Sequence, residues 1–160
     1  MPKALSFNQE KCTGCRACEA ACSFKHHQEF NPVKSNIHVS IYTEEASFVP
    51  LTCIQCTVPL CKEVCPTGAL QKSMINGAPV INVIEHKCVG CKMCMLACPF
   101  GCITVLETGR AHKCDLCGGE PECVIACNTG ALSFKSTEEG ALQKKRSVVD
   151  KFNGHQEEAI

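Results

Sequence analysis

The sequence predicts a small α+β fold with little regular structure, built from short β-hairpins and short helices. Three observations lead to this prediction. Cysteine is far more frequent than in an ordinary globular protein, with 17 in 160 residues. Large aromatic side chains are scarce, with seven Phe, one Tyr and no Trp. Apolar runs are short and widely separated. A chain with so little apolar bulk needs disulfides or bound metal to stabilise its core.

Sixteen of the 17 cysteines fall into four closely spaced groups. The groups are Cys12, Cys15, Cys18 and Cys22; Cys53, Cys56, Cys61 and Cys65; Cys88, Cys91, Cys94 and Cys98; and Cys114, Cys117, Cys123 and Cys127. The third group reads C-x2-C-x2-C-x3-C-P, in which three cysteines hold one four-iron cluster and the fourth ligates another. The pattern predicts four [4Fe–4S] clusters with these sixteen cysteines as iron ligands, and an apo chain that does not fold stably.

Disulfides and zinc are the two alternatives for so many cysteines. The first residues, "MPKALSFNQEK", show no apolar secretory signal, and an odd number of cysteines leaves one unpaired. Zinc ribbons use two C-x2-C pairs per ion and have no need of a third cysteine two residues on. Both alternatives are therefore disfavoured.

The spacing also contains an internal repeat. "CTGCRACEAAC" at 12–22 matches "CVGCKMCMLAC" at 88–98, and "CKEVCPTGAL" at 61–70 matches "CVIACNTGAL" at 123–132. The order indicates a two-cluster unit that has been duplicated.

Secondary structure is expected between and after the groups. Short helices are predicted around residues 17–24, 60–64, 93–97 and 122–126. Strands are predicted at 70–74 and 79–83, joined by a turn at Asn76-Gly77, and at 37–42, 48–51, 102–107 and 131–134.

The last residues contain no cysteine. Ser136 or Thr137 is a candidate cap for a helix that runs to Phe152 and ends at Asn153-Gly154. Two interpretations stay open: a solvated terminal helix, or a segment that docks a partner or a second copy.

With all four groups in view, residues 5–135 resemble the four-cluster, ferredoxin-like electron-transfer subunits of redox complexes. This family includes iron–sulfur subunits of dimethyl sulfoxide reductase-type enzymes and of tungsten aldehyde oxidoreductases. It also includes polyferredoxins that serve carbon monoxide dehydrogenase, formate hydrogenlyase and hydrogen-dependent carbon dioxide reductase. The resemblance implies two pseudo-twofold ferredoxin-like modules packed around the clusters.

The resemblance further implies a nested pairing of the cysteine groups, first with fourth and second with third. The implied ligand sets are Cys12, Cys15, Cys18 and Cys127; Cys114, Cys117, Cys123 and Cys22; Cys53, Cys56, Cys61 and Cys98; and Cys88, Cys91, Cys94 and Cys65. The duplication alone suggests first with second instead. Proline follows only Cys65 and Cys98, which favours nesting. The implied modules are an outer half, 1–45 plus 108–135, an inserted inner half, 46–107, and a tail, 136–160.

Several residues near the ligands are of interest. Cys102 is expected to be a small buried side chain beside a cluster. Lys11, Lys87 and Lys113 precede the first cysteine of three groups. Arg16 and Lys92 lie inside two of the loops. Positive charge near a cluster raises its reduction potential, but such loop charges are often only solvated.

The histidines carry no ligand spacing. His86 and His112 lie in matching "HKC" contexts and are expected at the surface, and no role is assigned to His26 or His27.

Composition narrows the function. Formal net charge is zero, which disfavours nucleic-acid binding, and no apolar stretch approaches the length of about 20 residues of a membrane span. No phosphate loop, nucleophilic triad or dinucleotide fingerprint is present, so the chain is not expected to be an enzyme on its own.

We expect a cytoplasmic electron-transfer subunit. It would relay single electrons between a catalytic subunit containing tungsten, molybdenum or nickel and a soluble ferredoxin or flavin subunit. Tungsten aldehyde oxidoreductase is the favoured partner. The alternatives are a free polyferredoxin and a filament built from further copies of the chain. A fourth possibility is an interaction module that binds zinc. Such a protein would be colourless and would show no redox activity.

Overall fold

The computed structural model describes residues 3–139, 141–142, 145 and 149. Within them lie eight short strands and four α-helices, joined by single turns of 3₁₀ helix. The strands are β1 Lys3–Phe7, β2 Ile37–Tyr42, β3 Ser47–Thr52, β4 Leu70–Ile75, β5 Ala78–Val83, β6 Ile103–Val105, β7 Ala111–Lys113 and β8 Leu132–Ser136. The helices are α1 Ala17–His27, α2 Leu60–Glu63, α3 Met93–Ala97 and α4 Glu122–Ile125.

The strands form four separate antiparallel pairs. Three are local hairpins, β2 with β3, β4 with β5 and β6 with β7. The fourth joins β1 to β8 from opposite ends of the described residues, with Leu5 opposite Phe134. All the other helices and strands named above lie between these two strands in the sequence. The pairing of β1 with β8 is therefore a contact of very long sequence separation.

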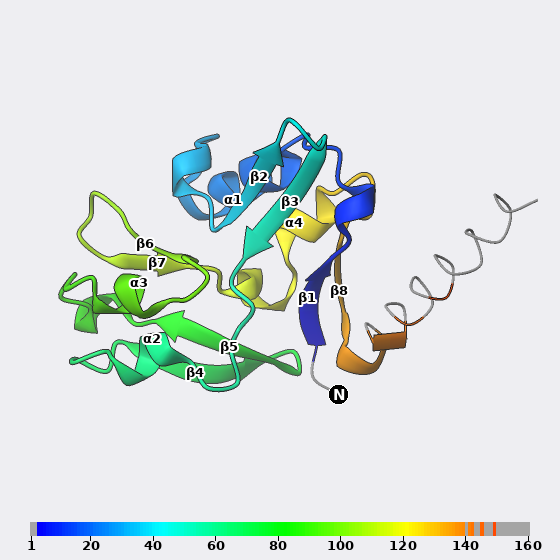
Figure 1. Cartoon of the computed structure of the whole chain (residues 1–160). Coiled ribbons are helices and arrows are strands. Elements are labelled where there is room, and N and C mark those ends of the chain that lie inside the picture. Colours follow the sequence, from blue (N-terminus) through cyan, green and yellow to red (C-terminus); the bar gives the residue numbers. More distant parts are fainter. Residues whose placement is uncertain (1–2, 140, 143–144, 146–148, 150–160) are drawn as a thin grey trace, which may run out of the picture.

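The helices show which cysteine groups lie together. Helix α1 packs against α4, and α2 packs against α3. In Figure 1, α2, α3 and strands β4 to β7 gather on one side of the molecule, and α1, α4, β2 and β3 on the other. The first and fourth cysteine groups are therefore neighbours, and the second and third groups are neighbours.

The boundaries expected for these two halves fall inside two hairpins. A boundary at residues 45–46 cuts the hairpin of β2 and β3, in which Ile37 pairs with Thr52. A boundary at 107–108 cuts the hairpin of β6 and β7, in which Ile103 pairs with Lys113. Boundaries after Thr52 and after Lys113 would instead keep each hairpin whole.

Most predicted elements are present. Helix α3 and strand β2 have the expected bounds, and the turn between β4 and β5 has positive φ at Asn76 and Gly77, as a two-residue hairpin requires. Helix α1 extends three residues beyond the predicted 17–24. Strands β1 and β7 were not predicted.

The predicted start of the terminal helix lies within the described residues. Ser136 and Glu139 form a capping box: the Glu139 N–H donates to Ser136 Oγ, and the Ser136 N–H donates to Glu139 Oε2. The predicted end at Phe152, Asn153 and Gly154 lies outside the described residues.

Cysteines supply a large share of the core. Three clusters of buried side chains are present among the described residues, and every one contains cysteine. The first includes Cys88 and Cys94 beside Leu70 and Ile81. Six of the 18 buried hydrophobic residues in the described part of the chain are cysteines. The stability of the fold therefore depends on what the sulfurs bind.

Glu19 attaches strand β2 to helix α1. Its side chain is only 1% exposed, yet both oxygens have donors: Val39 N–H at 2.6 Å and Arg16 Nε at 2.7 Å. A buried carboxylate is tolerated when its lone pairs are satisfied in this way. The contact fixes the hairpin over the first cysteine group.

Gly90, inside the third cysteine loop, illustrates how tightly the loops are packed. Its φ is +68°, and a Cβ placed there would lie 2.2 Å from the carbonyl oxygen of Gly109. Only glycine satisfies both the left-handed backbone and this close approach. Gly68 has a similar φ of +61°, but a Cβ placed on Gly68 would meet no other atom within 4 Å.

Replacing Gly90 with alanine is expected to destabilise the chain by more than about 2 kcal/mol, because backbone strain and a steric clash act together. The matched variant Gly68→Ala carries the strain alone and is expected to cost about 1 kcal/mol. Anaerobic denaturant titration, followed by loss of the visible absorbance, measures both. Equal midpoints for the two variants would contradict the packing described for Gly90.

Candidate iron–sulfur cluster sites

One cavity in the inner half is lined by four of the predicted ligands. These are Cys88, Cys91 and Cys94 of the third group and Cys65 of the second. Burial raises the pKa of the Cys94 thiol, and the neighbouring Cys88 and Cys65 raise it further. Four cysteines from two separate segments therefore line one cavity, in the combination that the nested pairing implies.

A second cavity, of about 60 Å³, contains the complementary set. Its cysteines are Cys53, Cys56 and Cys61 of the second group and Cys98 of the third. Cys102 lines the same cavity, is half-buried, and directs its thiol to the Phe100 carbonyl oxygen. The prediction that Cys102 packs beside a cluster site is consistent with this position.

In the outer half the sulfurs also converge. Burial raises the pKa of Cys123, and Cys114, Cys22 and Cys117 raise it further as near neighbours. The remaining predicted set lies in one apolar cluster, where Cys12 and Cys127 pack against a core that includes Cys18. Burial, with smaller contributions from the charges of Glu19 and Cys15, raises the pKa of Cys18 to about 11.

The fourth cysteine of each group receives N–H donors. Asn36 N–H points at Cys22 Sγ, Ala69 N–H at Cys65 Sγ and Cys102 N–H at Cys98 Sγ, at 3.3 to 3.4 Å. At Cys127, burial raises the thiol pKa, but the backbone N–H groups of Leu132 and Ala131 outweigh it and lower the pKa. Such donors favour thiolate, the form that binds iron.

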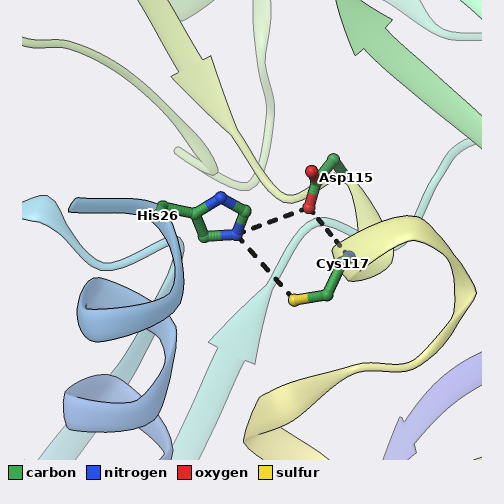
Figure 2. A group of neighbouring side chains, drawn as sticks. All are labelled: His26, Asp115 and Cys117. Atoms are coloured by element: carbon green, nitrogen blue, oxygen red, sulfur yellow. Dashed lines mark hydrogen bonds and ion pairs between the residues drawn. The ribbon is translucent and has the colours of Figure 1, made fainter. Parts of the chain in front are cut away.

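His26 is a site residue that the sequence did not reveal. Its Nε2 lies 3.8 Å from Cys117 Sγ and 3.5 Å from Asp115 Oδ1, and Cys117 N–H donates to the same carboxylate oxygen (Figure 2). Hydrogen bonds with Cys117 and Cys22 raise the pKa of His26 to about 10. The imidazole therefore lies beside two predicted ligands of one cluster. No spacing rule links residue 26 to residue 117, so only the fold brings them together.

The other histidines divide between surface and interior. His86 is exposed, as expected, but the same expectation is wrong for His112. His112 Nε2 lies 2.9 Å from His27 Nε2, and burial lowers the pKa of His112 to about 4. The reason is that the His112 ring lies against the rings of His26 and His27 at the end of helix α1, whereas His86 lies in an exposed 3₁₀ turn.

The basic residues near the ligands divide in the same way. Lys11, Lys87 and Lys92 are exposed, in agreement with solvated loop charges. Arg16 is also exposed, but its Nε pairs with the buried Glu19 carboxylate at 2.7 Å. Lys113 is only 5% exposed. Its ammonium lowers the pKa of Cys61 and Cys114, although burial raises both more strongly.

Exposure differs between the cysteine groups. Cys15 and Cys91 are the two exposed cysteines, and the other fifteen are buried or half-buried. Both are the second cysteine of a C-x2-C-x2-C loop, and they belong to opposite halves. The protein thus presents one sulfur site to solvent in each half.

The donor set fits iron–sulfur clusters better than other metals. Each of the two inner cavities is lined by four cysteines, with backbone N–H groups at the sulfurs of Cys65 and Cys98. Soft thiolates in fours suit zinc or iron–sulfur clusters. In both cavities three cysteines come from one group and the fourth from another, which is the arrangement of ligands around iron–sulfur clusters.

Comparison with protein families gives two matches. A 4Fe-4S dicluster domain model matches residues 44–137, and a second 4Fe-4S dicluster domain model matches residues 11–70. Together they cover all four cysteine groups. None of the helices among the described residues has the length and apolar character of a membrane span.

Curated relatives cover most of the chain. The polyferredoxin-like subunit of an aliphatic sulfonate oxidoreductase from Pyrococcus furiosus is 42% identical over 121 residues, which is 74% of this chain and 68% of the relative. The B subunit of the anaerobic dimethyl sulfoxide reductase from Haemophilus influenzae is 33% identical over 156 residues, covering 83% of this chain and 73% of the relative.

A solved structure gives a similar result. The active site complex BamBC of benzoyl coenzyme A reductase, in complex with 1,5-dienoyl-CoA, contains a polypeptide that is 30% identical, with a TM-score of 0.50. The likeness covers 83% of this chain and 75% of that polypeptide. With its four cysteine groups, its short hairpins and these matches, the chain belongs to the 4Fe-4S dicluster domain family of ferredoxin-like iron–sulfur proteins.

Proposed function

We propose that this chain is the electron-transfer subunit of a multi-subunit oxidoreductase and binds four [4Fe–4S] clusters. When bound, such a cluster accepts and releases one electron at a time. The observation that carries the proposal is that cysteines of different groups come together, in two cavities of the inner half and around Cys123 in the outer half.

We assign the ligands in nested sets, which also divides the chain into an inserted inner half and an outer half related as two ferredoxin-like modules. The inner assignment is supported by the two cavities, each lined by one complete set. The outer assignment is supported by the contact of α1 with α4 and by the neighbours of Cys123.

The four sites form a continuous series in this assignment. Cys53 of an inner set and Cys114 of an outer set pack in the same buried cluster, so these two sites meet where the halves join. The exposed Cys15 and Cys91 belong to the other two sets. Electrons would therefore enter at one exposed end and leave at the other.

The chain's own groups prepare these sites for negative charge. A four-iron cluster with four thiolates carries a charge of about −2. Backbone N–H groups directed at the sulfurs of Cys22, Cys65 and Cys98 stabilise that charge. Buried neighbours such as Leu70 and Ile81 exclude water.

The partner is proposed from the relatives and the sequence resemblance. Relatives include subunits of a sulfonate oxidoreductase and a dimethyl sulfoxide reductase, which supports a catalytic partner of the oxidoreductase class. Within that class we favour a cytoplasmic tungsten aldehyde oxidoreductase, with a soluble ferredoxin or flavin subunit at the other end.

The nested assignment predicts which double substitutions share a cluster. Cys65→Ser and Cys91→Ser each lose one cluster, and the double variant is expected to lose no further iron, because both residues ligate the same site. Starting from about 16 iron atoms, all three variants should retain about 12. Iron and acid-labile sulfide analysis of anaerobic protein measures this.

Two controls accompany this comparison. Cys61→Ser with Cys65→Ser should retain about eight iron atoms, because these residues ligate different clusters. Cys102→Ser should retain them all. If the Cys65/Cys91 double variant retains about eight iron atoms, the nested pairing is wrong.

The subunit proposal predicts a stoichiometric partner. An anaerobic pull-down of the tagged chain from its own cells should recover a large subunit carrying tungsten, measured by metal analysis of the complex. Molybdenum or nickel would revise the partner and keep the subunit role. A lone brown protein would instead favour a free polyferredoxin, and large assemblies of this chain alone would favour a filament.

A further inference from the structure

Lys113 is a buried cation at the place where the two halves meet. It ends strand β7 and directly precedes Cys114, and its side chain is 5% exposed. A lysine this buried is unusual unless its charge is compensated. Among the described residues, Lys113 makes no ion pair with a carboxylate.

The hydrogen bonds of Lys113 identify its protonation state. Nζ lies 2.6 Å from the Ile81 carbonyl oxygen, 2.7 Å from the Cys114 carbonyl oxygen and 3.3 Å from Gln55 Oε1. All three partners are acceptors in this arrangement, because Gln55 Nε2 itself donates to the Cys114 carbonyl. A neutral amine has only two N–H donors, whereas an ammonium has three. The site is therefore built for the charged form.

The partners of Lys113 come from both halves. Gln55 lies between Cys53 and Cys56 of an inner set, and Ile81 lies on strand β5 of the same half. Cys114 is a ligand of an outer set. Lys113 is thus held between the two cluster sites that meet at the junction, with no other described anion to balance it.

We propose that Lys113 is a fixed positive charge shared by the two junction clusters, where it raises the reduction potentials of both. This inference rests on the proposed function, since it requires clusters at both sites. A buried charge near a cluster is only weakly screened by solvent. A positive charge stabilises the reduced form of the cluster more than the oxidised form, because the reduced form is more negative, and this raises the reduction potential. In this proposal Lys113 acts on the clusters through its charge and does not ligate iron.

The chain provides its own comparison. His86-Lys87-Cys88 repeats the tripeptide His112-Lys113-Cys114, but Lys87 is exposed. A solvated lysine is screened by water and salt, so its effect on the adjacent site is small. Comparing substitutions of Lys87 and Lys113 therefore distinguishes the effect of burial on the cluster potentials from the effect of the neighbouring sequence.

The test is an anaerobic redox titration monitored by electron paramagnetic resonance, on holoprotein with its iron content measured. In Lys113→Met, two of the clusters should shift to lower potential by at least a tenfold change in their one-electron equilibrium, which is about 59 mV. Lys113→Arg keeps the charge and should stay near the wild type. Lys87→Met should shift much less.

Fully loaded Lys113→Met with unchanged potentials overturns the proposal. If Lys113→Met does not load, Lys113→Gln keeps hydrogen-bond donors without the charge and is titrated in its place, with the same two readings. If both neutral variants fail while Lys113→Arg loads, the charge itself is needed by the clusters, which supports the proposal. If all three fail, Lys113 is only a structural support and the proposal is wrong. Absence of clusters from the wild type would instead refute the proposed function.

Discussion

The crowding of sulfur is the constraint on which this fold depends. Groups of four thiols meet in confined spaces, where burial raises the pKa of buried members such as Cys114 and Cys123. Without metal, these thiols must stay protonated or repel one another as thiolates. With iron bound, the same sulfurs become cross-links between distant segments. The short strands and single-turn helices then need only hold the loops in place.

The topology follows from this constraint. In the proposed assignment each cysteine group supplies three ligands to its own site and the fourth to another, so two segments must fold against each other before either site is complete. The pairing of β1 with β8 brings the outer segments together, and the contact of α2 with α3 does the same for the inner ones. One cysteine is exposed in each half, Cys15 and Cys91, so an electron relay would have one accessible site for entry and one for exit.

Sequence reasoning succeeded where the signal was local. Ligand spacing predicted the position of α3, and the Asn76-Gly77 turn predicted the hairpin of β4 and β5, because both depend on neighbouring residues. Strand β1 was missed because its partner lies more than a hundred residues away. The different burial of Lys87 and Lys113 has no signal in the identical tripeptides around them. His26 likewise approaches Cys117 only through the packing of α1 against the fourth group.

The central claim, that the sixteen cysteines together hold four clusters, is tested most directly by Mössbauer spectroscopy of iron-57-labelled protein with iron and protein quantified. We expect about 16 iron atoms per polypeptide, all in [4Fe–4S] clusters. About eight iron atoms in a fully folded protein, in two clusters, would contradict the claim, because half of the converging sulfurs would then have no metal to hold.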